Sequence, residues 1–117
     1  MKESRKMDTS ILEKIGFTKI TGEEDKTISG GYVGDMLSWV MGRARAGNCW
    51  FTIINNLNTI AVASLVDVSA IVFCDGVTLD NAVIDKAKEE DINIYYTKLS
   101  TFEAVVAFND IFSKDND

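Results

Sequence analysis

The sequence predicts a three-layer α/β domain, with a mostly parallel sheet of about five strands and helices on both faces. Short apolar runs typical of strands alternate with segments in which apolar residues recur at helical spacing. The connections are short, and the crossovers between parallel strands must cover a sheet that is buried on each side. A length of 117 residues suits one compact domain.

The first part of the chain supplies a short helix and two strands. Thr9 or Ser10 can cap a helix that Gly16 ends. Residues 17–21 are predicted to form a strand, 22–26 a charged turn, and 27–33 a weakly alternating strand. We expect the pair Gly30 and Gly31 to end this second strand as a flexible connection to the next helix.

Residues 35–46 form a helical pattern whose apolar residues repeat as one buried stripe: Leu37, Val40, Met41 and Ala44. Met36 and Trp39 widen that stripe. A helix that is apolar around much of its circumference must be buried on two sides. We therefore expect one side of this helix to pack on the sheet and the other side to pack on a second subunit. Met36, Trp39 and Val40 are therefore predicted to form the contact of a homodimer.

The remaining elements continue the alternation. Residues 49–54 and 69–74 are predicted to be internal strands, with a buried helix from Leu57 between them. A surface helix follows over residues 80–91, then a strand over 92–96, and Ser100 or Thr101 caps the last helix. We expect residues 9–112 to be the domain, and 1–8 and 113–117 to be flexible ends.

Composition excludes several classes of function. The chain has no histidine, which rules out Ser-His-Asp catalysis and removes the commonest zinc ligand. A net charge of −6 would repel a phosphate backbone, so no nucleic-acid partner is expected. Residues 1–6 lead into no long apolar stretch of the kind that a signal peptide requires. No apolar run is long enough to span a membrane, and the two cysteines form no disulfide pattern. We therefore predict a cytoplasmic protein.

We expect a binding site at the carboxyl ends of the predicted strands, because the loops of neighbouring parallel strands converge there. Polar residues follow four of the strands: Gly30, Gly31, Asp35, Asn55, Asn56, Asp75, Thr97, Ser100 and Thr101. They predict a small-molecule pocket, with amides near Gly34 available to a carboxylate or phosphate. The alternative is ordinary turn and cap chemistry, which favours the same residue types.

Residues 30–34 deserve comparison with a phosphate-binding loop, since glycines let backbone amides approach an anion. The pattern G-x-x-x-x-G-K-[ST] is absent, no lysine follows in the first helical turn, and G-x-G-x-x-G is not met. Kinase or ATPase activity is therefore not expected.

Three further sets of residues are predicted to be structural. Trp39 and Trp50 fall within apolar patterns typical of core or subunit packing. Cys49 and Cys74 lie in predicted strands without C-x-x-C spacing, so we interpret them as small buried hydrophobic residues. Arg43 and Arg45 mark a solvated helix end, where cations are favoured.

Several ordered segments resemble the DRTGG domain family: residues 30–41, 50–53, 61–63, 71–73, 87–92 and 100–103. The resemblance covers about residues 11–112. The motif that gives the family its name, Asp-Arg-Thr-Gly-Gly, is matched only loosely by residues 25–31. Lys26 stands in place of the arginine, and Ile28-Ser29 is inserted between the threonine and the two glycines. We therefore do not assign to Lys26 any role that this arginine has in the family.

The resemblance implies a compact α/β domain that occurs alone or fused to CBS pairs, pyrophosphatases and phosphotransacetylases. Its shape is related to the N-terminal domain of HPr kinase. It implies a regulatory or oligomerising module of unestablished ligand. Similar stand-alone members accompany hydrogenase or anti-sigma-like genes, which implies a protein partner in a regulatory or hydrogenase-associated system.

Three hypotheses follow for the function. The first is a non-enzymatic regulatory module that forms a homodimer and needs no cofactor. The second is a sensor of a nucleotide or small metabolite at the carboxyl ends of the strands. The third is an enzyme that uses the carboxylates of Asp35 or Asp75, with a metal such as magnesium.

Overall fold

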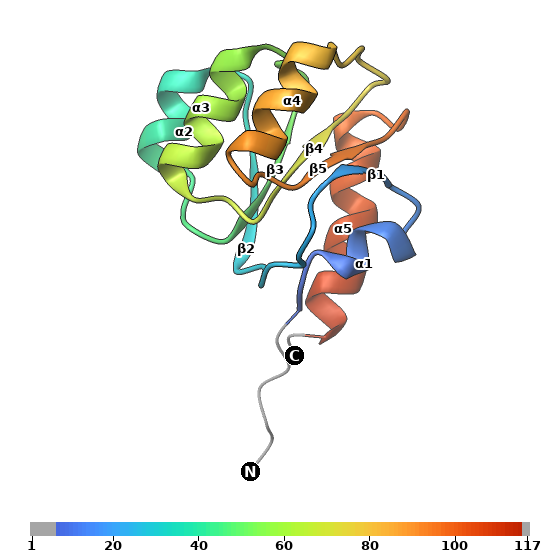
Figure 1. Cartoon of the computed structure of the whole chain (residues 1–117). Coiled ribbons are helices and arrows are strands. Elements are labelled where there is room, and N and C mark those ends of the chain that lie inside the picture. Colours follow the sequence, from blue (N-terminus) through green and yellow to red (C-terminus); the bar gives the residue numbers. More distant parts are fainter. Residues whose placement is uncertain (1–6, 116–117) are drawn as a thin grey trace.

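In the computed structural model, which describes residues 7–115, a five-stranded sheet forms the centre of the fold, with helices packed around it (Figure 1). The strands lie in the order β1-β5-β4-β3-β2. Strands β2 to β5 are mutually parallel, whereas β1 pairs antiparallel with β5 at one end of the sheet. The strand bounds are β1 Thr18–Thr21, β2 Gly30–Val33, β3 Asn48–Thr52, β4 Ala70–Phe73 and β5 Ile94–Tyr96. The predicted mostly parallel sheet is confirmed.

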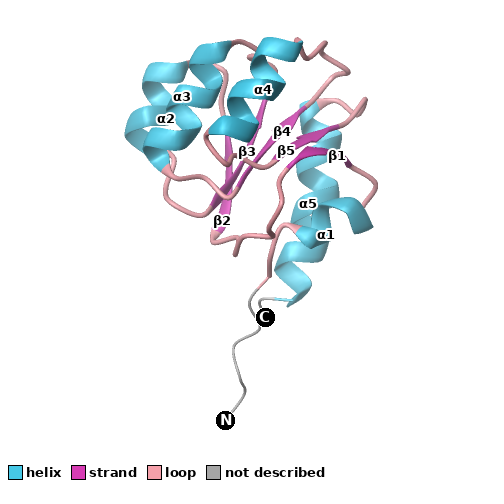
Figure 2. Ribbon diagram, viewed as in Figure 1, coloured by secondary structure: helices cyan, strands magenta, loops and turns pink. Residues whose placement is uncertain are grey.

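Helices cover both faces of the sheet (Figure 2). One face carries α2 (Leu37–Arg43), α3 (Leu57–Val66) and α4 (Asn81–Glu89), and the other carries α1 (Ser10–Lys14) and α5 (Thr101–Asp115). Because β2 to β5 follow one another across the sheet, crossovers of one hand place α2, α3 and α4 on one side. The chain changes side after β5, where α5 crosses to the opposite face, so the three predicted layers are present.

Alternation along the central strands builds two hydrophobic cores, one on each face. On β3, Trp50 packs in the core under α2, α3 and α4, whereas Phe51 packs in the core under α1 and α5. The Phe51 ring meets the Phe108 ring edge-on at 5.3 Å between centroids. Trp50 and Phe51 are both buried, as are Cys49 and Cys74, whose thiols are free. The predictions for Trp50 and the cysteines are therefore confirmed.

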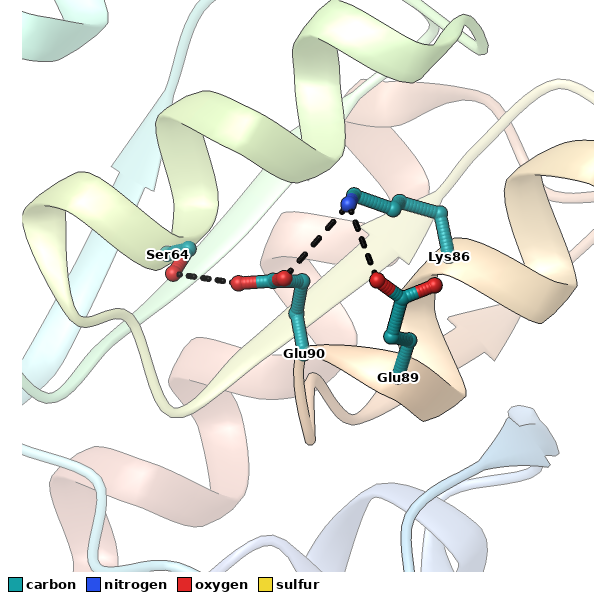
Figure 3. A network of polar contacts seen from close by, with 4 residues as sticks. All are labelled: Ser64, Lys86, Glu89 and Glu90. Carbon is teal, nitrogen blue, oxygen red and sulfur yellow. Dashed lines mark hydrogen bonds and ion pairs between the residues drawn. The ribbon is translucent and has the colours of Figure 1, made fainter.

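A polar network joins α3 to the end of α4 at the surface (Figure 3). Ser64 Oγ donates a hydrogen bond of 3.3 Å to Glu90 Oε1. Lys86 Nζ lies 3.3 Å from Glu89 Oε1 and 3.5 Å from Glu90 Oε2. Because these groups are largely exposed, the network adds little to stability.

The second helix is shorter than predicted and buries a narrower stripe. It spans Leu37–Arg43 instead of residues 35–46, because the backbone of Ala44 is extended, with ψ at 155°. Met41 is half exposed, so its predicted burial is wrong. Val40 already occupies the centre of the inward face, and the next residue lies about 100° further around the helix.

Two residues of the expected flexible N-terminus are packed in the fold. Met7 is buried, and Asp8 forms an antiparallel bridge with Thr27. At the other end, Ser113 and Lys114 continue α5. The expected flexibility of residues 1–6 and 116–117 lies outside the described residues. Among the helices of residues 7–115, none combines the length and apolar character needed to cross a membrane.

Candidate functional site

The carboxyl edge of the parallel strands brings together side chains from three loops. Asp35 follows β2, and its Oδ1 atom accepts a hydrogen bond of 2.7 Å from Thr52 Oγ1 and one of 2.9 Å from the amide of Ile53. Thr52 ends β3 and is fully buried. The carboxylate of Asp35 is therefore fixed against the end of the neighbouring strand.

The loops after β4 and β5 meet beside this position. The amide of Asp75 donates to the Leu99 carbonyl at 2.8 Å, and the amide of Gly76 donates to the Thr97 carbonyl at 3.0 Å. Asp75 adopts a left-handed conformation, with φ at 61°. Its Oδ2 atom lies 3.5 Å from Thr101 Oγ1, at the start of α5. The helices that follow β4 and β5 lie on opposite faces, which is the arrangement that opens a crevice in α/β sheets.

Cys74 ties these loops into one neighbourhood. Burial raises the pKa of its thiol to about 11, contact with the Thr101 side chain opposes that rise, and the carboxylates of Asp75 and Asp35 add to it. The amide of Cys74 also donates to the Thr52 carbonyl at 3.0 Å, which places the end of β4 beside the residue that holds Asp35. A thiol with such a pKa is protonated near neutral pH and is a poor nucleophile.

The other polar residues of this edge mainly serve the backbone. Asn56 Oδ1 accepts from the amide of Asn58 at the start of α3. Asn55 Nδ2 donates to the Thr78 carbonyl. Thr97 Oγ1 accepts from the amide of Leu99, and Ser100 forms a reciprocal cap with Glu103, each bond being 3.1 Å. These contacts agree with the turn and cap alternative, and the ligand-binding role of the residues stays a prediction.

Gly30 and Gly31 lie at the amino ends of the parallel strands, whereas the other predicted site residues lie at or beyond the carboxyl ends. They are the first two residues of β2 and pair with Asn48 and Cys49 at the start of β3. Their expected position in the loop after the strand is wrong, because strand pairing continues through Tyr32 and Val33. A Cβ on Gly31 would lie 3.3 Å from the Phe108 ring, so close packing under α5 explains this glycine.

Sequence reasoning missed two members of the carboxyl edge, Thr52 and Cys74. Thr52 lies inside the predicted strand 49–54 and Cys74 is the last residue of the predicted strand 69–74, so the sequence pattern assigns neither of them to a loop. The polar Thr52 inside an otherwise apolar run was the available signal, since a buried hydroxyl requires a partner.

A second candidate surface lies on α2 and the turn before it. Met36 is 58% exposed, Trp39 54% and Met41 50%. The guanidinium carbon of Arg43 lies 4.0 Å from the centroid of the Trp39 ring. Val40 has no exposed surface, so its prediction as a dimer contact is wrong: its side chain packs inward, in the core beneath the three helices.

Comparison with known proteins identifies the fold. No protein-family model matches the sequence, and no curated protein matches it. A solved structure does match, that of the CBS and DRTGG domains of the regulatory region of Clostridium perfringens pyrophosphatase, complexed with the activator diadenosine tetraphosphate. The TM-score is 0.70 and the sequence identity 21%, and the match covers 83% of this chain and 43% of that chain. This chain thus spans less than half the length of the matched one, and it shares the fold of a region containing a DRTGG domain, as the sequence resemblance implied.

Proposed function

We propose that this chain is a non-enzymatic regulatory module that works as a homodimer, joined through the α2 surface of Met36, Trp39 and Met41. The observation that carries the proposal is the exposure of these three large apolar side chains within six residues, each at half or more of its surface. Single exposed apolar residues are ordinary, whereas a group of them marks an interaction surface.

The contact between Trp39 and Arg43 supports the same surface. A guanidinium stacked on an indole holds the ring in one orientation, which lowers the entropy cost of burying it. Tryptophan and arginine are the residue types most enriched among the dominant contacts of protein interfaces. We therefore place Trp39 at the centre of the dimer contact.

The shared fold supports a regulatory role. The matched structure belongs to the regulatory region of a pyrophosphatase. A module with this fold, with a self-associating surface, can transmit a signal to a partner by changing its own assembly. We further place it in the cytoplasm, where the free thiols of Cys49 and Cys74 stay reduced.

Light scattering after gel filtration, at 1 to 100 μM protein, tests the dimer. We expect a dimer for the natural chain and a monomer for Trp39→Glu, because a charge at the centre of the contact would be buried unpaired. Val106→Glu is the matched control, since Val106 is also half exposed but lies on α5, on the opposite face. A natural chain that is monomeric at 100 μM rejects the proposal, as does a dimer that survives Trp39→Glu.

A second candidate function is a nucleotide or metabolite sensor at the carboxyl edge. It is favoured by the convergence of Asp35, Cys74, Asp75 and Thr101 and by the nucleotide activator in the matched structure. Two carboxylates repel phosphate oxygens but accept hydrogen bonds from ribose hydroxyls and from the adenine amino group. We therefore expect this edge to contact the nucleoside part of a ligand.

Thermal unfolding with diadenosine tetraphosphate, adenine nucleotides, acetyl phosphate and coenzyme A tests the sensor. A ligand at 100 times its dissociation constant adds about 2.7 kcal/mol to the free energy of unfolding, which raises Tm by several degrees. Asp75→Asn should abolish the shift, and the exposed Asp85→Asn, with the same change of charge, should retain it. Absence of a shift with all of these compounds would count decisively against the sensor.

A further inference from the structure

A cleft with a volume of about 920 Å³ opens on the β1 side of the sheet, away from the surfaces described so far. Strand β1 and the loop after it form one wall, and the end of α4 and Glu13 of α1 form the others. Charged residues dominate the lining: Glu13, Lys19, Glu23, Glu24, Lys88 and Asp91.

The cleft runs along an unused strand edge. Strand β1 is at the end of the strand order and pairs on one side only, with β5. The backbone groups on its outer side are therefore available to an added strand. Lys19 and the bulge between Lys19 and Thr21 restrict how such a strand can pair, which limits the edge to a short partner segment.

The charge of the cleft favours a cationic partner. Four carboxylates stand against two ammonium groups in the lining, a formal excess of two negative charges. Within the described part of the chain, the carboxylates of Glu13, Glu23, Glu24 and Asp91 form no hydrogen bond or ion pair. These four carboxylates are therefore available to a cationic ligand. They come from three separate segments of the chain that line the same cleft.

The loop after β1 packs closely on the buried side chain of Asn93. Gly22, in the lining, has φ at 127°, and a Cβ there would lie 2.5 Å from Oδ1 of the fully buried Asn93. That oxygen has no hydrogen-bond partner among the described residues, whereas the Asn93 amide nitrogen donates to the Glu24 carbonyl at 3.0 Å. Asn93 therefore fixes the loop after β1 through its contacts with Gly22 and Glu24, and this reduces the entropy that the loop loses on binding.

We propose that this cleft binds a short, extended, basic segment of a partner protein, which adds to β1 as a sixth strand while its lysine or arginine side chains reach the four carboxylates. The backbone of β1 supplies affinity that does not depend on sequence, and the carboxylates select for positive charge. This docking site is independent of the α2 surface.

Fluorescence anisotropy with the labelled, end-blocked peptide KTKVKTK at 150 mM salt tests the proposal on the full chain. We expect saturable binding, at least tenfold weaker for the same peptide carrying N-methyl groups on alternate residues, because methylation blocks strand addition but keeps the charge. The acidic peptide ETEVETE should not bind. Equal binding of the methylated peptide, binding of the acidic one, or no binding of the basic one each overturns the proposal.

Two charge variants separate the cleft from general attraction to an acidic protein. The double variant Glu23→Gln and Glu24→Gln should weaken binding at least fivefold, whereas Asp85→Asn with Asp110→Asn, which removes the same charge from exposed helix positions, should not. Amide chemical shifts should move in residues 18–24 and 88–92. Shifts confined to other elements, or equal effects of the two double variants, overturn the assignment, as does peptide binding that merely displaces a second copy from β1.

Discussion

The hydroxyl of Thr52 donates a hydrogen bond of 2.7 Å to the carboxylate of Asp35, and this contact joins the ends of β3 and β2. Thr52 is fully buried, so its hydroxyl depends on that acceptor. The same carboxylate oxygen accepts from the amide of Ile53, which continues the chain beyond β3. Asp35 thus acts as a clamp on the carboxyl edge of the sheet, whatever else binds there.

Replacing Asp35 by alanine should lower the free energy of unfolding by about 1 to 3 kcal/mol, because a buried hydroxyl loses its charged acceptor. Asp35→Asn keeps an oxygen acceptor and should lose less. Urea unfolding at pH 7 measures both. Asp85→Ala is the control, since Asp85 is exposed on α4 and should change stability by no more than about 0.5 kcal/mol. A loss from Asp85→Ala equal to that from Asp35→Ala would contradict the clamp.

The layers of this fold were predictable because its central strands, β3 and β4, are short apolar runs with buried side chains on both faces. The run around Val72 has no alternation, which is typical of a parallel strand covered on each side. The helix that contains Val83 and Ala87 shows the spacing of a surface helix, and both residues are buried. Patterns of this kind fix the identity of an element and its inward face.

Positions that depend on a partner far away in sequence were not predictable. Gly30 and Gly31 suit a flexible loop by composition, and only their pairing with β3 places them in a strand. Local spacing also cannot distinguish Trp39, which is exposed, from Val40, which is buried, because both lie in one wide apolar arc. The cleft beside β1 joins Glu13 to Asp91, and no sequence pattern relates them.

Gly22→Ala should destabilise the protein by about 2 to 4 kcal/mol, since it combines a strained backbone with a clash against a buried amide. Gly16→Ala is the matched control, because its φ of 99° is also unfavourable but a Cβ would meet nothing within 4 Å. Urea midpoints of the two variants measure the difference. If both variants lose the same stability, the contact between Gly22 and Asn93 contributes nothing beyond backbone strain.

Stability should fall as pH rises above about 9, because the buried acids are neutral in the native state. Burial raises the pKa of Cys74 from 9.0 to about 11, and burial raises the pKa of Tyr95 from 10.0 to about 12. Burial also raises the pKa of Cys49. The unfolded chain releases these protons first, so each contribution is fully present below the unfolded pKa and is lost as pH rises toward the folded one.

Cys74→Ala should therefore reduce the loss of unfolding free energy between pH 8 and pH 10 by about 1 kcal/mol. Urea unfolding under reducing conditions at the two pH values gives this difference. Val72→Ala is the control, because it removes buried methyl groups from the same core without removing a titrating group. A pH dependence of Cys74→Ala that matches the natural chain would show that the thiol is not linked to folding.

Substitution of the two tryptophans should have different effects on the free energy of unfolding, and acrylamide should quench their fluorescence to different extents. Trp50 Nε1 donates to the Gly34 carbonyl at 3.0 Å, and the ring is fully buried. Trp50→Phe should therefore cost about 2 to 3 kcal/mol, from the lost bond and the space left behind, whereas Trp39→Phe should cost no more than about 0.5 kcal/mol. In dilute solution, acrylamide should quench Trp39 in the Trp50→Phe variant far more strongly than Trp50 in the Trp39→Phe variant. If Trp39 is the centre of a dimer contact, its quenching should weaken as protein concentration rises; quenching independent of concentration would contradict that role.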